Sequence, residues 1–372
     1  MNTPASPTRR QFLSRTSTGL GAALLVAQAP GILSVGRAAD SGRKINFALA
    51  GLGSLSTNQI APALQKTKHA RLAGIITGTP AKAEAWKAKY GIPDKNIYNY
   101  DTMVNLKDNP DIDVVYVVTP NGLHKEHTIK AAQAGKHVLC EKPMANTAKD
   151  CQAMINACKQ ARVKLAIGYR CQFTPQHQEC IRIAREKEMG AIKIIEAGFG
   201  FRIGDPNQWR LRADLAGGGA LMDVGVSALQ ACRYLVGEEP KLVSAIEIKT
   251  DPVKFAEVDE SLTWQMTFPS GVIAYCSTSY NVNGINRFTA YADQGWFGMD
   301  PAYSYSGIKV KTSKGEREFE QVDHFAAEMD DFARCIIENR ESRVAGVEGL
   351  RDMVVIEGIY KSIKTGRTVK LG

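Results

Sequence analysis

Short apolar runs alternate with amphipathic stretches along the first half of the chain. The first run, Ile45–Ala50, is apolar at most of its positions, which is typical of a strand buried on both faces of a sheet. The predicted strands are Ile45–Ala50, Arg71–Thr77, Asp113–Thr119, His137–Cys140 and Lys164–Gly168, and the predicted helices are Asn58–Lys66, Ala81–Tyr90, His124–Ala134 and Thr147–Arg162. Strands that alternate with helices indicate βαβ units, so residues 44–168 are predicted to form a doubly wound domain around a parallel sheet.

The pattern changes after Pro175. One more helix is expected over residues 175–188, and β-rich segments then follow one another with turn residues between them. The further predicted strands are Ile192–Ile203, Lys241–Ile248, Ser261–Phe268, Val272–Ser279 and Arg287–Ala292, and the further helices are Leu221–Val236, Asp323–Glu338 and Gly349–Lys364. Successive strands without helices between them indicate an antiparallel or mixed sheet with a helix on one face. The fold class is therefore α/β, with a second α/β domain over residues 169–372.

A glycine-rich loop follows the first predicted strand and opens the first predicted helix. It reads GLGSLS over residues 51–56, a G-x-G-x-x-S form of the dinucleotide fingerprint, which usually ends in Gly or Ala. Gly51 permits the tight turn, and Gly53 lets the backbone approach a pyrophosphate at the helix N-terminus. Together with Ser54 and Leu55 they are candidate cofactor-binding residues. The alternative is a glycine turn in an ordinary α/β protein.

The end of the second predicted strand indicates which dinucleotide binds. An Asp or Glu at this place would hold the ribose 2′-hydroxyl of NAD. The sequence ITGTPAKAE has no acid before Glu84. Thr77 can donate a hydrogen bond to a 2′-phosphate instead, and Lys82 supplies a positive charge. NADP is therefore expected rather than NAD, unless Lys82 only faces solvent on its helix.

Polar residues also follow the third clear strand. Thr119, Pro120, Asn121 and His124 come at its C-terminal end, where doubly wound folds bind their ligands. They are candidate cofactor contacts. For His124 the alternative is a helix N-terminal residue that does not contact the cofactor.

A glycine run leads into one helix of the second domain, where residues 217–230 read GGGALMDVGVSALQ. Asp223 is the one acid in this stretch, and Ser227 lies one helical turn later. An inward-facing acid suggests a working site, although a cap or a buried salt bridge would also place an acid there. The sequence between His177 and His324 contains no histidine, so proton transfer here needs another residue type.

Composition and charge narrow the class of protein. The chain has 372 residues, 44% of them hydrophobic and 23% charged, which suits a soluble protein with two domains. The formal net charge is +9, but the basic residues are scattered and no basic run is interleaved with aromatic residues. A nucleic-acid partner is therefore not expected. The 8 cysteines form no CxxC or similar pair, so no metal site is predicted either.

Part of the positive charge belongs to the N-terminus. TRRQFLS at residues 8–14 precedes an apolar stretch of 14 residues, which is shorter than the roughly 20 residues that a membrane-spanning helix needs. A twin arginine before a short apolar segment indicates a twin-arginine export signal over residues 1–38. Cleavage after Ala38 would remove 4 arginines and leave a charge of +5. We expect a periplasmic protein with no membrane partner after cleavage; the alternative is a tail that stays attached.

More specific motifs follow the fourth strand. CEKPMA over residues 140–145 places Glu141, Lys142 and Pro143 at a strand end, and this resembles the signature of the Gfo/Idh/MocA oxidoreductases. Within that family the glucose–fructose oxidoreductase group is the most similar. The matching stretches are Ala50–Gly53, Ala134–Ala145, Ile167–Cys171, Gln208–Arg212, Leu215–Gly225 and Arg233–Pro240. The resemblance therefore spans nearly the whole chain after the export signal.

The resemblance implies a Rossmann domain and then an α/β domain with a large, open, mostly antiparallel sheet. It implies a sugar bound between the domains, NADP that stays tightly bound, and back-to-back packing of sheets into a homodimer or homotetramer. It also supports Thr77 and Lys82 as contacts of the 2′-phosphate. Glu141 and Lys142 are implied cofactor-binding residues. Lys142 is in addition the implied catalytic residue, which polarises the sugar oxygen, unless it only binds the cofactor ribose.

Aromatic and basic residues in the matching stretches are candidates for the substrate pocket. An aromatic face and guanidinium donors suit a polyhydroxylated ring. The candidates are Tyr169, Arg170, Trp209, Arg210 and Arg212, of which the first two are also cofactor candidates. Core packing is an alternative for Trp209, and a structural salt bridge is an alternative for Arg212.

Position 227 departs from the family pattern. Other members carry His there and the glucose–fructose group carries Tyr, and that residue usually transfers the proton. The hydroxyl of Ser227 is too weakly acidic for this role and can only relay a proton or hold a water. Lys142 is therefore expected to move the proton, with Asp223 beside it to orient the sugar hydroxyls. A tyrosine from another segment, such as Tyr169 or Tyr280, could also take the role.

The expected function is hydride transfer between an aldose and tightly bound NADP. Because the periplasm lacks a free NADP(H) pool, a ping-pong reaction with a second carbonyl substrate is expected. Two alternatives stay open. One is a redox-neutral enzyme that oxidises, eliminates and re-reduces a single glycoside, and the other is an NADP- and sugar-binding homologue without catalysis.

Overall fold

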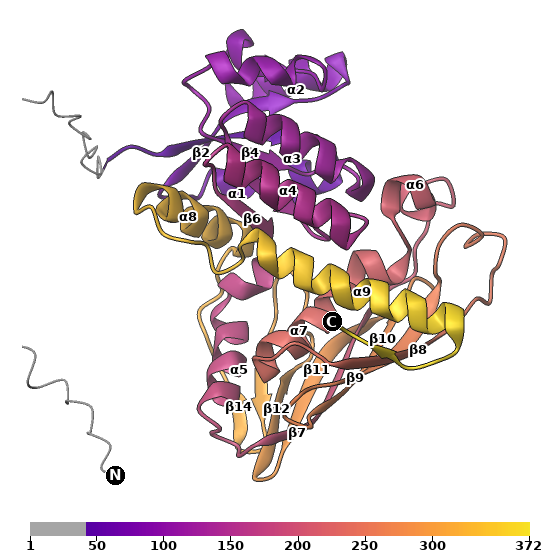
Figure 1. The fold of residues 1–372 in the computed structure, drawn as a ribbon. Helices are drawn as coiled ribbons and strands as arrows, with labels where there is room; N and C mark the ends of the chain where they lie inside the picture. Colours follow the sequence, from indigo (N-terminus) through magenta and orange to yellow (C-terminus); the bar gives the residue numbers. More distant parts are fainter. Residues whose placement is uncertain (1–41) are drawn as a thin grey trace, which may run out of the picture. The chain divides into compact units, whose positions relative to one another are not determined.

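The computed structural model describes residues 42–372. The export signal expected over residues 1–38 lies outside the described residues and stays a prediction. In the described part, a smaller sheet wrapped in helices is followed along the chain by a larger sheet (Figure 1). The candidate site is built from both.

All strand pairs of the first sheet are parallel. Its strands are β1 (Ile45–Ala50), β2 (Ala70–Ile76), β3 (Ile97–Tyr98), β4 (Val114–Val117), β5 (His137–Glu141) and β6 (Leu165–Gly168). Their spatial order is β3-β2-β1-β4-β5-β6, the order of a Rossmann fold. Every residue of β1 is buried, as its apolar sequence predicts. The order reverses between β1 and β4, and this is where such sheets bind their ligands.

Helices cover both faces of this sheet. They are α1 (Ala61–Leu64), which continues a π-helical turn over Ser56–Ile60, α2 (Pro80–Tyr90), α3 (His124–Gln133) and α4 (Ala148–Gln160). α3 packs on β4 and β5 and lies beside α4, whereas α1 packs on β2 together with α8 (His324–Ile337) from the end of the chain. The start of α4 is capped because the side chain of Thr147 accepts a hydrogen bond from the backbone nitrogen of Asp150.

The second sheet has nine strands in the order β14-β13-β12-β11-β7-β10-β9-β8-β15. The strands are β7 (Ile192–Gly200), β8 (Leu242–Ile248), β9 (Ser261–Thr267), β10 (Ile273–Ser279), β11 (Ile285–Ala292), β12 (Gly295–Met299), β13 (Val310–Thr312), β14 (Gly315–Arg317) and β15 (Val369–Lys370). β7 and β10 run parallel and the other neighbours run antiparallel. Along β9, Leu262, Trp264 and Met266 are buried while the residues between them are not, so the sheet has one core face.

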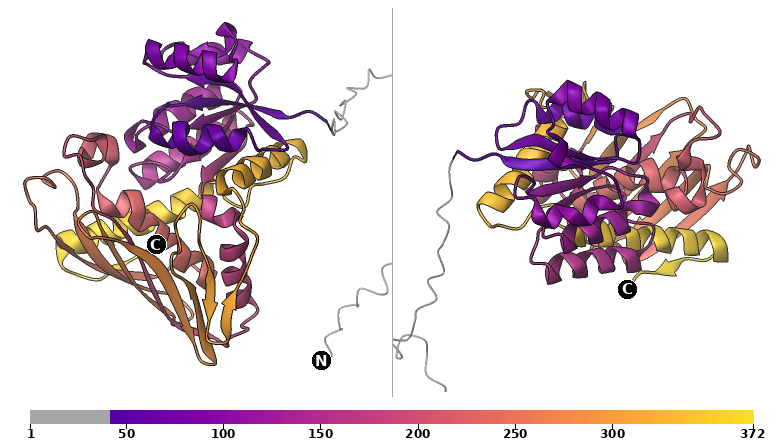
Figure 2. Two further views of the ribbon diagram at one scale, coloured as in Figure 1. Left: turned by 180° about the vertical axis from the view of Figure 1, so that it is seen from behind. Right: turned by 90° about the horizontal axis from the view of Figure 1, so that it is seen from above.

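The core face of this sheet is covered by helices. α7 (Val226–Val236) packs on β7, β10 and β11, and α5 (Pro175–Arg185) packs against α7. The long helix α9 (Gly346–Thr365) packs on β8 and also on α4 of the first domain. A short helix, α6 (Ala213–Ala216), precedes the glycine run. Seen from behind, the strands face the viewer without a helical layer over them (Figure 2, left).

The fold class agrees with the prediction, a doubly wound parallel sheet followed by a larger, mostly antiparallel sheet. The predicted helices and strands are present with ends shifted by a few residues. The sequence pattern missed β3 and β12 to β15, because these strands are short and β12 contains two glycines. Among the described helices, the segment Ala213–Val236 is long and apolar enough to cross a membrane, but 67% of its most apolar window is buried. This is expected for a core helix.

Candidate active site

The loop after β1 turns sharply at Gly51, where φ is +96°. A Cβ atom there would lie 2.6 Å from the backbone oxygen of Val118, so glycine is required. Gly53 has open space where a side chain would stand. The hydroxyl of Ser56 donates a hydrogen bond to the backbone oxygen of Gly51 at 2.5 Å and ties the loop to the helix that it opens. The backbone of this loop is therefore free to approach a ligand.

A cavity of about 500 Å³ opens beside this loop, at the C-terminal ends of β1, β2 and β4. It is lined by Gly51, Leu52, Gly53, Ser54, Leu55, Thr77, Gly78, Thr79, Lys82, Tyr100, Val118, Thr119, Pro120, Asn121, His124, Glu141, Lys142, Trp209, Arg210 and Asp223. The glycine cradle and the helix N-terminus fit the pyrophosphate of a dinucleotide. Apart from Tyr169 and Arg170, every residue predicted to bind the cofactor lines this cavity.

No acidic side chain lines the cavity at the C-terminal end of β2. Thr77, Gly78 and Thr79 line the cavity there, and the Thr77 hydroxyl accepts a hydrogen bond from the backbone nitrogen of Thr79 at 3.2 Å. Lys82 is exposed on the first turn of α2 and lines the same region. A hydroxyl and an ammonium group at this place suit an anion better than a ribose diol.

The segment after β4 is held by internal hydrogen bonds. The two ring nitrogens of His124 lie 2.8 Å from the backbone oxygen of Thr119 and 2.9 Å from that of Pro143. Burial lowers the pKa of His124. Asn121 donates to the backbone oxygen of Ala216 at 2.9 Å. The His124 ring thus lies between two backbone oxygens and, when neutral, donates a hydrogen bond to one of them, which favours the alternative of a structural role.

Glu141 is buried beside Lys142. The hydroxyl of Tyr116 donates to Glu141 at 2.7 Å and lies 3.2 Å from a carboxyl oxygen of Glu328. Burial raises the pKa of Glu141 and raises that of Glu328 well above its usual range. One hydroxyl can donate its proton to only one of the two carboxyl groups, and burial favours a proton on the other.

Asp223 is the centre of the site. Lys142 donates to its backbone oxygen, and the Lys142 ammonium lies 3.4 Å from its Oδ1. Its Oδ2 accepts hydrogen bonds from Nε of Arg210 at 3.0 Å and from the Tyr280 hydroxyl at 2.9 Å. Burial alone would raise the pKa of Asp223, but the charges of Lys142 and Arg210 outweigh it and the pKa is lowered. Asp223 is therefore an ionised carboxylate whose position is fixed by its partners.

The glycine run explains how Asp223 comes to face inward. The carboxylate of Asp259 accepts hydrogen bonds from the backbone nitrogens of Gly219 at 2.6 Å and Leu221 at 2.8 Å, and from the Tyr360 hydroxyl at 2.6 Å. A Cβ atom at Gly219 would lie 1.9 Å from the backbone oxygen of Asp259. Asp259 thus binds the start of a π-helical turn over Leu221–Gly225 that carries Asp223 and continues as α7.

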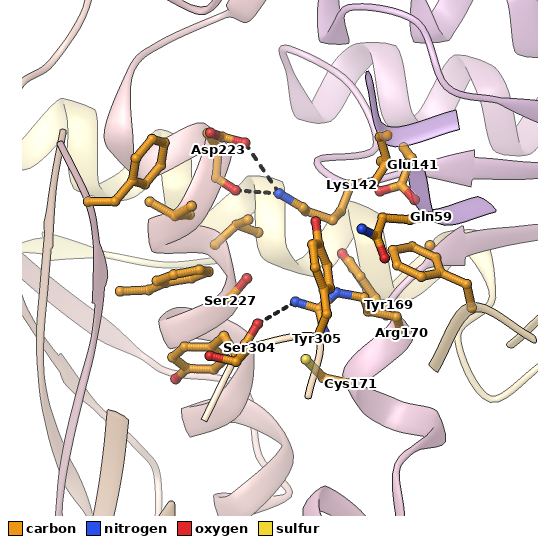
Figure 3. Close-up of a pocket in the computed structure, with 18 of the residues that line it drawn as sticks. Gln59, Glu141, Lys142, Tyr169, Arg170, Cys171, Asp223, Ser227, Ser304 and Tyr305 are labelled. Carbon is orange, nitrogen blue, oxygen red and sulfur yellow. Dashed lines mark hydrogen bonds and ion pairs between the residues drawn. The ribbon is translucent and has the colours of Figure 1, made fainter. Parts of the chain in front are cut away.

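A second cavity, of about 660 Å³, meets the first at Lys142 and Asp223. Six residues line both: Ser54, Leu55, Glu141, Lys142, Arg210 and Asp223. The rest of its lining comprises Asn58, Gln59, Gly168, Tyr169, Arg170, Cys171, Phe199, Phe201, Gln208, Val224, Val226, Ser227, Gln230, Asn286, Tyr303, Ser304, Tyr305 and Phe325. Figure 3 shows Lys142 and Asp223 together on one side, with Ser227, Ser304 and Tyr305 around the space below them. Aromatic faces mixed with hydroxyl and amide groups suit a polyhydroxylated molecule.

Two parts of the chain match family profiles. Residues 45–169 match the GFO_IDH_MocA oxidoreductase family with an NAD-binding Rossmann fold, and residues 177–298 match the GFO/IDH/MocA C-terminal domain. The chain belongs to the Gfo/Idh/MocA oxidoreductase family. This confirms the family that the EKP motif and its neighbours predicted.

Similar proteins act on sugars. The crystal structure of aldose–aldose oxidoreductase from Caulobacter crescentus, complexed with glycerol, has a TM-score of 0.86 and 46% identity, and the match covers 88% of this chain and 100% of that one. D-xylose 1-dehydrogenase (NADP(+)) from Haloarcula marismortui is 29% identical, over 88% of this chain and 93% of its own. Levoglucosan dehydrogenase in complex with NADH and levoglucosan has a TM-score of 0.77 and 23% identity over 88% of this chain and 100% of its own, and shares the fold.

The structure places the predicted catalytic residues of this family member together. Lys142, Asp223 and Ser227 all line the second cavity. Within residues 42–372, no three His, Cys, Asp or Glu side chains are grouped as metal ligands would be. The cluster therefore offers an ammonium, a fixed carboxylate and a hydroxyl.

The predicted substrate residues fall into different places. Arg210 contacts Asp223, and Trp209 lies under its guanidinium at 4.6 Å and lines the first cavity. Arg170 lines the second cavity. Arg212 is exposed, pairs with Asp214 at 2.9 Å and lines neither cavity. This placement favours the structural salt bridge that was its alternative.

Neither of the two tyrosines suggested as substitutes for residue 227 has a hydroxyl that is free to transfer the proton. The Tyr169 hydroxyl donates to Asp352 at 2.5 Å, away from Lys142, although its ring lines the second cavity. Tyr280 is 1% exposed and donates to Asp223, and it lines neither cavity. Tyr280 thus fixes Asp223, and the expectation that Tyr169 or Tyr280 takes the proton-transfer role is wrong because both hydroxyls are buried against carboxylates. The ring of Tyr169 still lines the second cavity, where it was expected as a substrate-pocket residue.

Sequence reasoning missed the residues that the far end of the chain brings to the site. Asn286 on β11, the loop residues Tyr303, Ser304 and Tyr305, and Phe325 on α8 line the second cavity. One signal was available: the stretch AYSYSG, over residues 302–307, is a loop sequence rich in tyrosine and serine between two strands.

Proposed function

We propose that this protein is a sugar oxidoreductase that transfers a hydride between an aldose and bound NADP. The observation that carries the proposal is the junction of the two cavities at Lys142 and Asp223. One cavity has the glycine cradle of a dinucleotide site, and the other has the mixed aromatic and polar lining of a sugar site. The Caulobacter aldose–aldose oxidoreductase and the Haloarcula D-xylose dehydrogenase support an aldose as the substrate class.

The chain's own residues would perform binding and charge stabilisation. NADP, when bound, supplies or accepts the hydride. The Lys142 ammonium stands at the junction, where it can donate a hydrogen bond to the reacting sugar oxygen and stabilise negative charge there. Asp223 holds Lys142 and Arg210 in place, and the aromatic rings of the second cavity can stack on the sugar face.

NADP is favoured over NAD by the end of β2. Thr77 and Lys82 line the cavity where a 2′-phosphate would lie, and no acid stands there to hold a 2′-hydroxyl. The Haloarcula relative is named for NADP(+). Gly51, Gly53, Ser54 and Leu55 would hold the pyrophosphate.

The twin-arginine motif at Arg9 and Arg10 supports export to the periplasm with the cofactor already in place. Since no free NADP(H) pool exists there, the cofactor has to be regenerated on the enzyme. A ping-pong cycle follows, in which one sugar is oxidised and a second carbonyl compound is reduced. Cell fractionation tests the location: the R9K/R10K variant should stay in the cytoplasm, whereas an exported variant would contradict the proposal.

The outer face of the second sheet supports a homodimer or homotetramer. Apolar side chains stand exposed on that face, with Ile246 at 67% and Ile248 at 61% exposure. The others are Ile194, Tyr275, Tyr291 and Trp296. An apolar face of this kind is typical of an interface. The double substitution of Ile246 and Ile248 by Asp should shift the molar mass measured by light scattering toward the monomer.

The first experiment is an absorbance spectrum of the dialysed protein, followed by titration with aldoses at the reduced-nicotinamide band. The proposal expects cofactor that survives dialysis, a band that rises with an aldose, and its collapse on adding a second carbonyl compound. Loss of the cofactor on dialysis would refute the ping-pong cycle. Bound cofactor that no aldose reduces would refute sugar oxidation. In that case, release of free sugar from a glycoside would indicate the redox-neutral reaction. Binding of sugar with neither reaction would indicate a protein without catalysis.

A further inference from the structure

Position 227 holds serine, so the site lacks the Tyr or His that the family resemblance implies there, and Lys142, the expected substitute, is held by the backbone oxygen and Oδ1 of Asp223. The titratable groups that line the second cavity can be taken in turn. Asp223 is ionised and engaged by Lys142, Arg210 and Tyr280. Glu141 accepts from the Tyr116 hydroxyl at 2.7 Å. Neither carboxyl group is free to exchange a proton with a sugar.

Two of the three tyrosines of this lining are also excluded, each for its own reason. The Tyr169 hydroxyl is occupied by Asp352. The Tyr303 hydroxyl is buried and has no hydrogen-bond partner, so it does not reach the cavity space. Cys171 lies below Tyr305, away from Lys142 and Asp223 (Figure 3). Tyr305 is left: it is 51% exposed, and within residues 42–372 no side chain or backbone group hydrogen bonds its hydroxyl.

The ring of Tyr305 is held in a defined place. The Arg170 guanidinium lies 4.6 Å from the ring centroid, and the ring of Phe325 lies 5.7 Å away. In Figure 3 the ring stands between Lys142 and Arg170. The ring is thereby packed against Arg170 and Phe325, while its hydroxyl end is left free.

The loop that carries Tyr305 is also fastened. The side-chain oxygen of Asn286 accepts hydrogen bonds from the backbone nitrogens of Ala302 at 3.0 Å and Tyr303 at 2.6 Å. Its amide nitrogen donates to the Ser304 hydroxyl at 2.9 Å. Arg170 donates to the backbone oxygen of Tyr303 at 2.5 Å. These contacts tie the loop to β11 and to the segment that follows β6 and lines the second cavity, so the position of Tyr305 does not depend on a flexible loop.

The charges around the hydroxyl suit an acid. Burial raises the pKa of Tyr305, Arg170 and Arg210 lower it, and Glu141 and Asp223 raise it, so the net pKa lies above its ordinary value. The hydroxyl therefore carries its proton at neutral pH. The charges of Arg170 and Arg210 favour the phenolate and so offset part of the burial that opposes its formation when the proton leaves.

We propose that Tyr305 is the catalytic acid–base of this chain and takes the role that residue 227 has in the family. In reduction, the substrate carbonyl carbon accepts the hydride from the dihydronicotinamide and the C=O π bond opens. The oxygen takes the Tyr305 proton, and a phenolate is left. In oxidation, Tyr305 would first have to lose its proton to solvent or to a preceding reduction, and the phenolate would then take the hydroxyl proton of an aldose whose carbon gives its hydride to bound NADP. One reduction and one oxidation return both the hydride and the proton, as a ping-pong cycle requires. This inference rests on the proposed function.

The test compares Tyr305→Phe with the parent and with Tyr90→Phe, which removes a hydroxyl on α2, outside both cavities. Phenylalanine keeps the ring that packs on Arg170. Y305F should retain NADP through dialysis and bind aldose as the parent does, measured by intrinsic fluorescence. Hydride transfer to the bound cofactor in a single turnover should slow about 10²–10⁴-fold. The reduction rate of the parent should fall as pH rises through the phenol pKa, and Y305F should lose this dependence.

A second substitution that restores activity tests whether the role of Tyr305 is proton transfer. Adding Ser227→Tyr to Y305F restores the family residue at the other wall of the cavity and should recover part of the lost rate. A Y305F rate within about tenfold of the parent, with the same pH profile, would overturn the role of Tyr305 while leaving the sugar oxidoreductase intact. A parent protein that no aldose reduces would overturn the proposed function, and the role of Tyr305 with it. Normal transfer by Y90F shows that loss of a phenol hydroxyl alone does not slow the reaction.

Discussion

The ammonium nitrogen of Lys142 lies 3.4 Å from Oδ1 of Asp223 and also donates to the backbone oxygen of the same residue. Lys142 directly follows β5 of the cofactor domain, and Asp223 lies in the π-helical turn Leu221–Gly225 that continues as α7 of the second domain. The pair therefore joins the two domains at the point where the two cavities meet. The contact agrees with the expectation, drawn from the family resemblance, that Asp223 lies beside Lys142.

Replacement of Asp223 by Asn should abolish most of the activity. The amide keeps the shape but removes the charge that holds Lys142 and Arg210. We expect kcat/KM to fall about 10²-fold or more, because aimed charges are worth several kcal/mol in such sites. Bound cofactor should remain, measured by absorbance after dialysis. Asp214→Asn, which breaks an exposed pair with Arg212, is the control and should leave kcat/KM unchanged. Equal activities of the two variants would contradict the role of Asp223.

Lys82 should set the preference between the two dinucleotides. Replacing it with Ala removes a cation from the part of the first cavity at the end of β2. We expect affinity for NADP to fall about tenfold, which is the size of one charge-assisted hydrogen bond, and affinity for NAD to stay the same. Isothermal titration of cofactor-free protein measures both. Lys89→Ala on the same helix, outside both cavities, should change neither affinity. A uniform loss for both dinucleotides would instead indicate damage to the fold.

Asp259 should be a strong determinant of stability. Its carboxylate accepts hydrogen bonds from Gly219, Leu221 and Tyr360 and is buried. In the Asp259→Asn variant the side chain has one oxygen instead of two, so at least one of these three donors loses its hydrogen-bond partner. The free energy of unfolding should fall by about 1–3 kcal/mol, measured by urea titration. Glu257→Gln, at an exposed site that accepts from the backbone nitrogen of Ala213, should cost much less.

The parts of the site that could be predicted are those that short motifs encode. Gly51 and Gly53 need only a strand before them and a helix after them, and Lys142 follows a strand within a recognisable motif. The Tyr305 hydroxyl could not be predicted, because its loop is held at the cavity by Asn286 on β11 and by Arg170 just after β6, both distant from it in the sequence. The expectation that Tyr169 transfers the proton failed for the same reason, because its hydrogen-bond partner Asp352 lies on α9, 183 positions later in the chain.

Glu328 should make the protein less stable as the pH rises. It is 1% exposed, one carboxyl oxygen has no hydrogen-bond partner, and the other lies 3.2 Å from the Tyr116 hydroxyl, which donates to Glu141. Burial, and then the charge of Glu141, raise the pKa of Glu328 well above its usual range. The folded protein therefore keeps this proton to higher pH than the unfolded chain, whose glutamate pKa is about 4.3.

The sign of the effect follows from the proton count. Above about pH 4.3 the folded state binds more protons at this residue than the unfolded state, so stability falls with rising pH by up to about 1.4 kcal/mol per unit until the folded pKa is reached. Glu328→Gln mimics the protonated acid and removes this dependence. The free energy of unfolding can be measured in urea at pH 5.5 and at pH 8. The parent should be less stable relative to E328Q at pH 8 than at pH 5.5. The control Glu320→Gln, at an exposed position, should show the same pH dependence as the parent. If the free energy of unfolding of E328Q is lower than that of the parent by the same amount at both pH values, Glu328 is ionised in the folded protein. The proton near the Tyr116 hydroxyl is then held by Glu141.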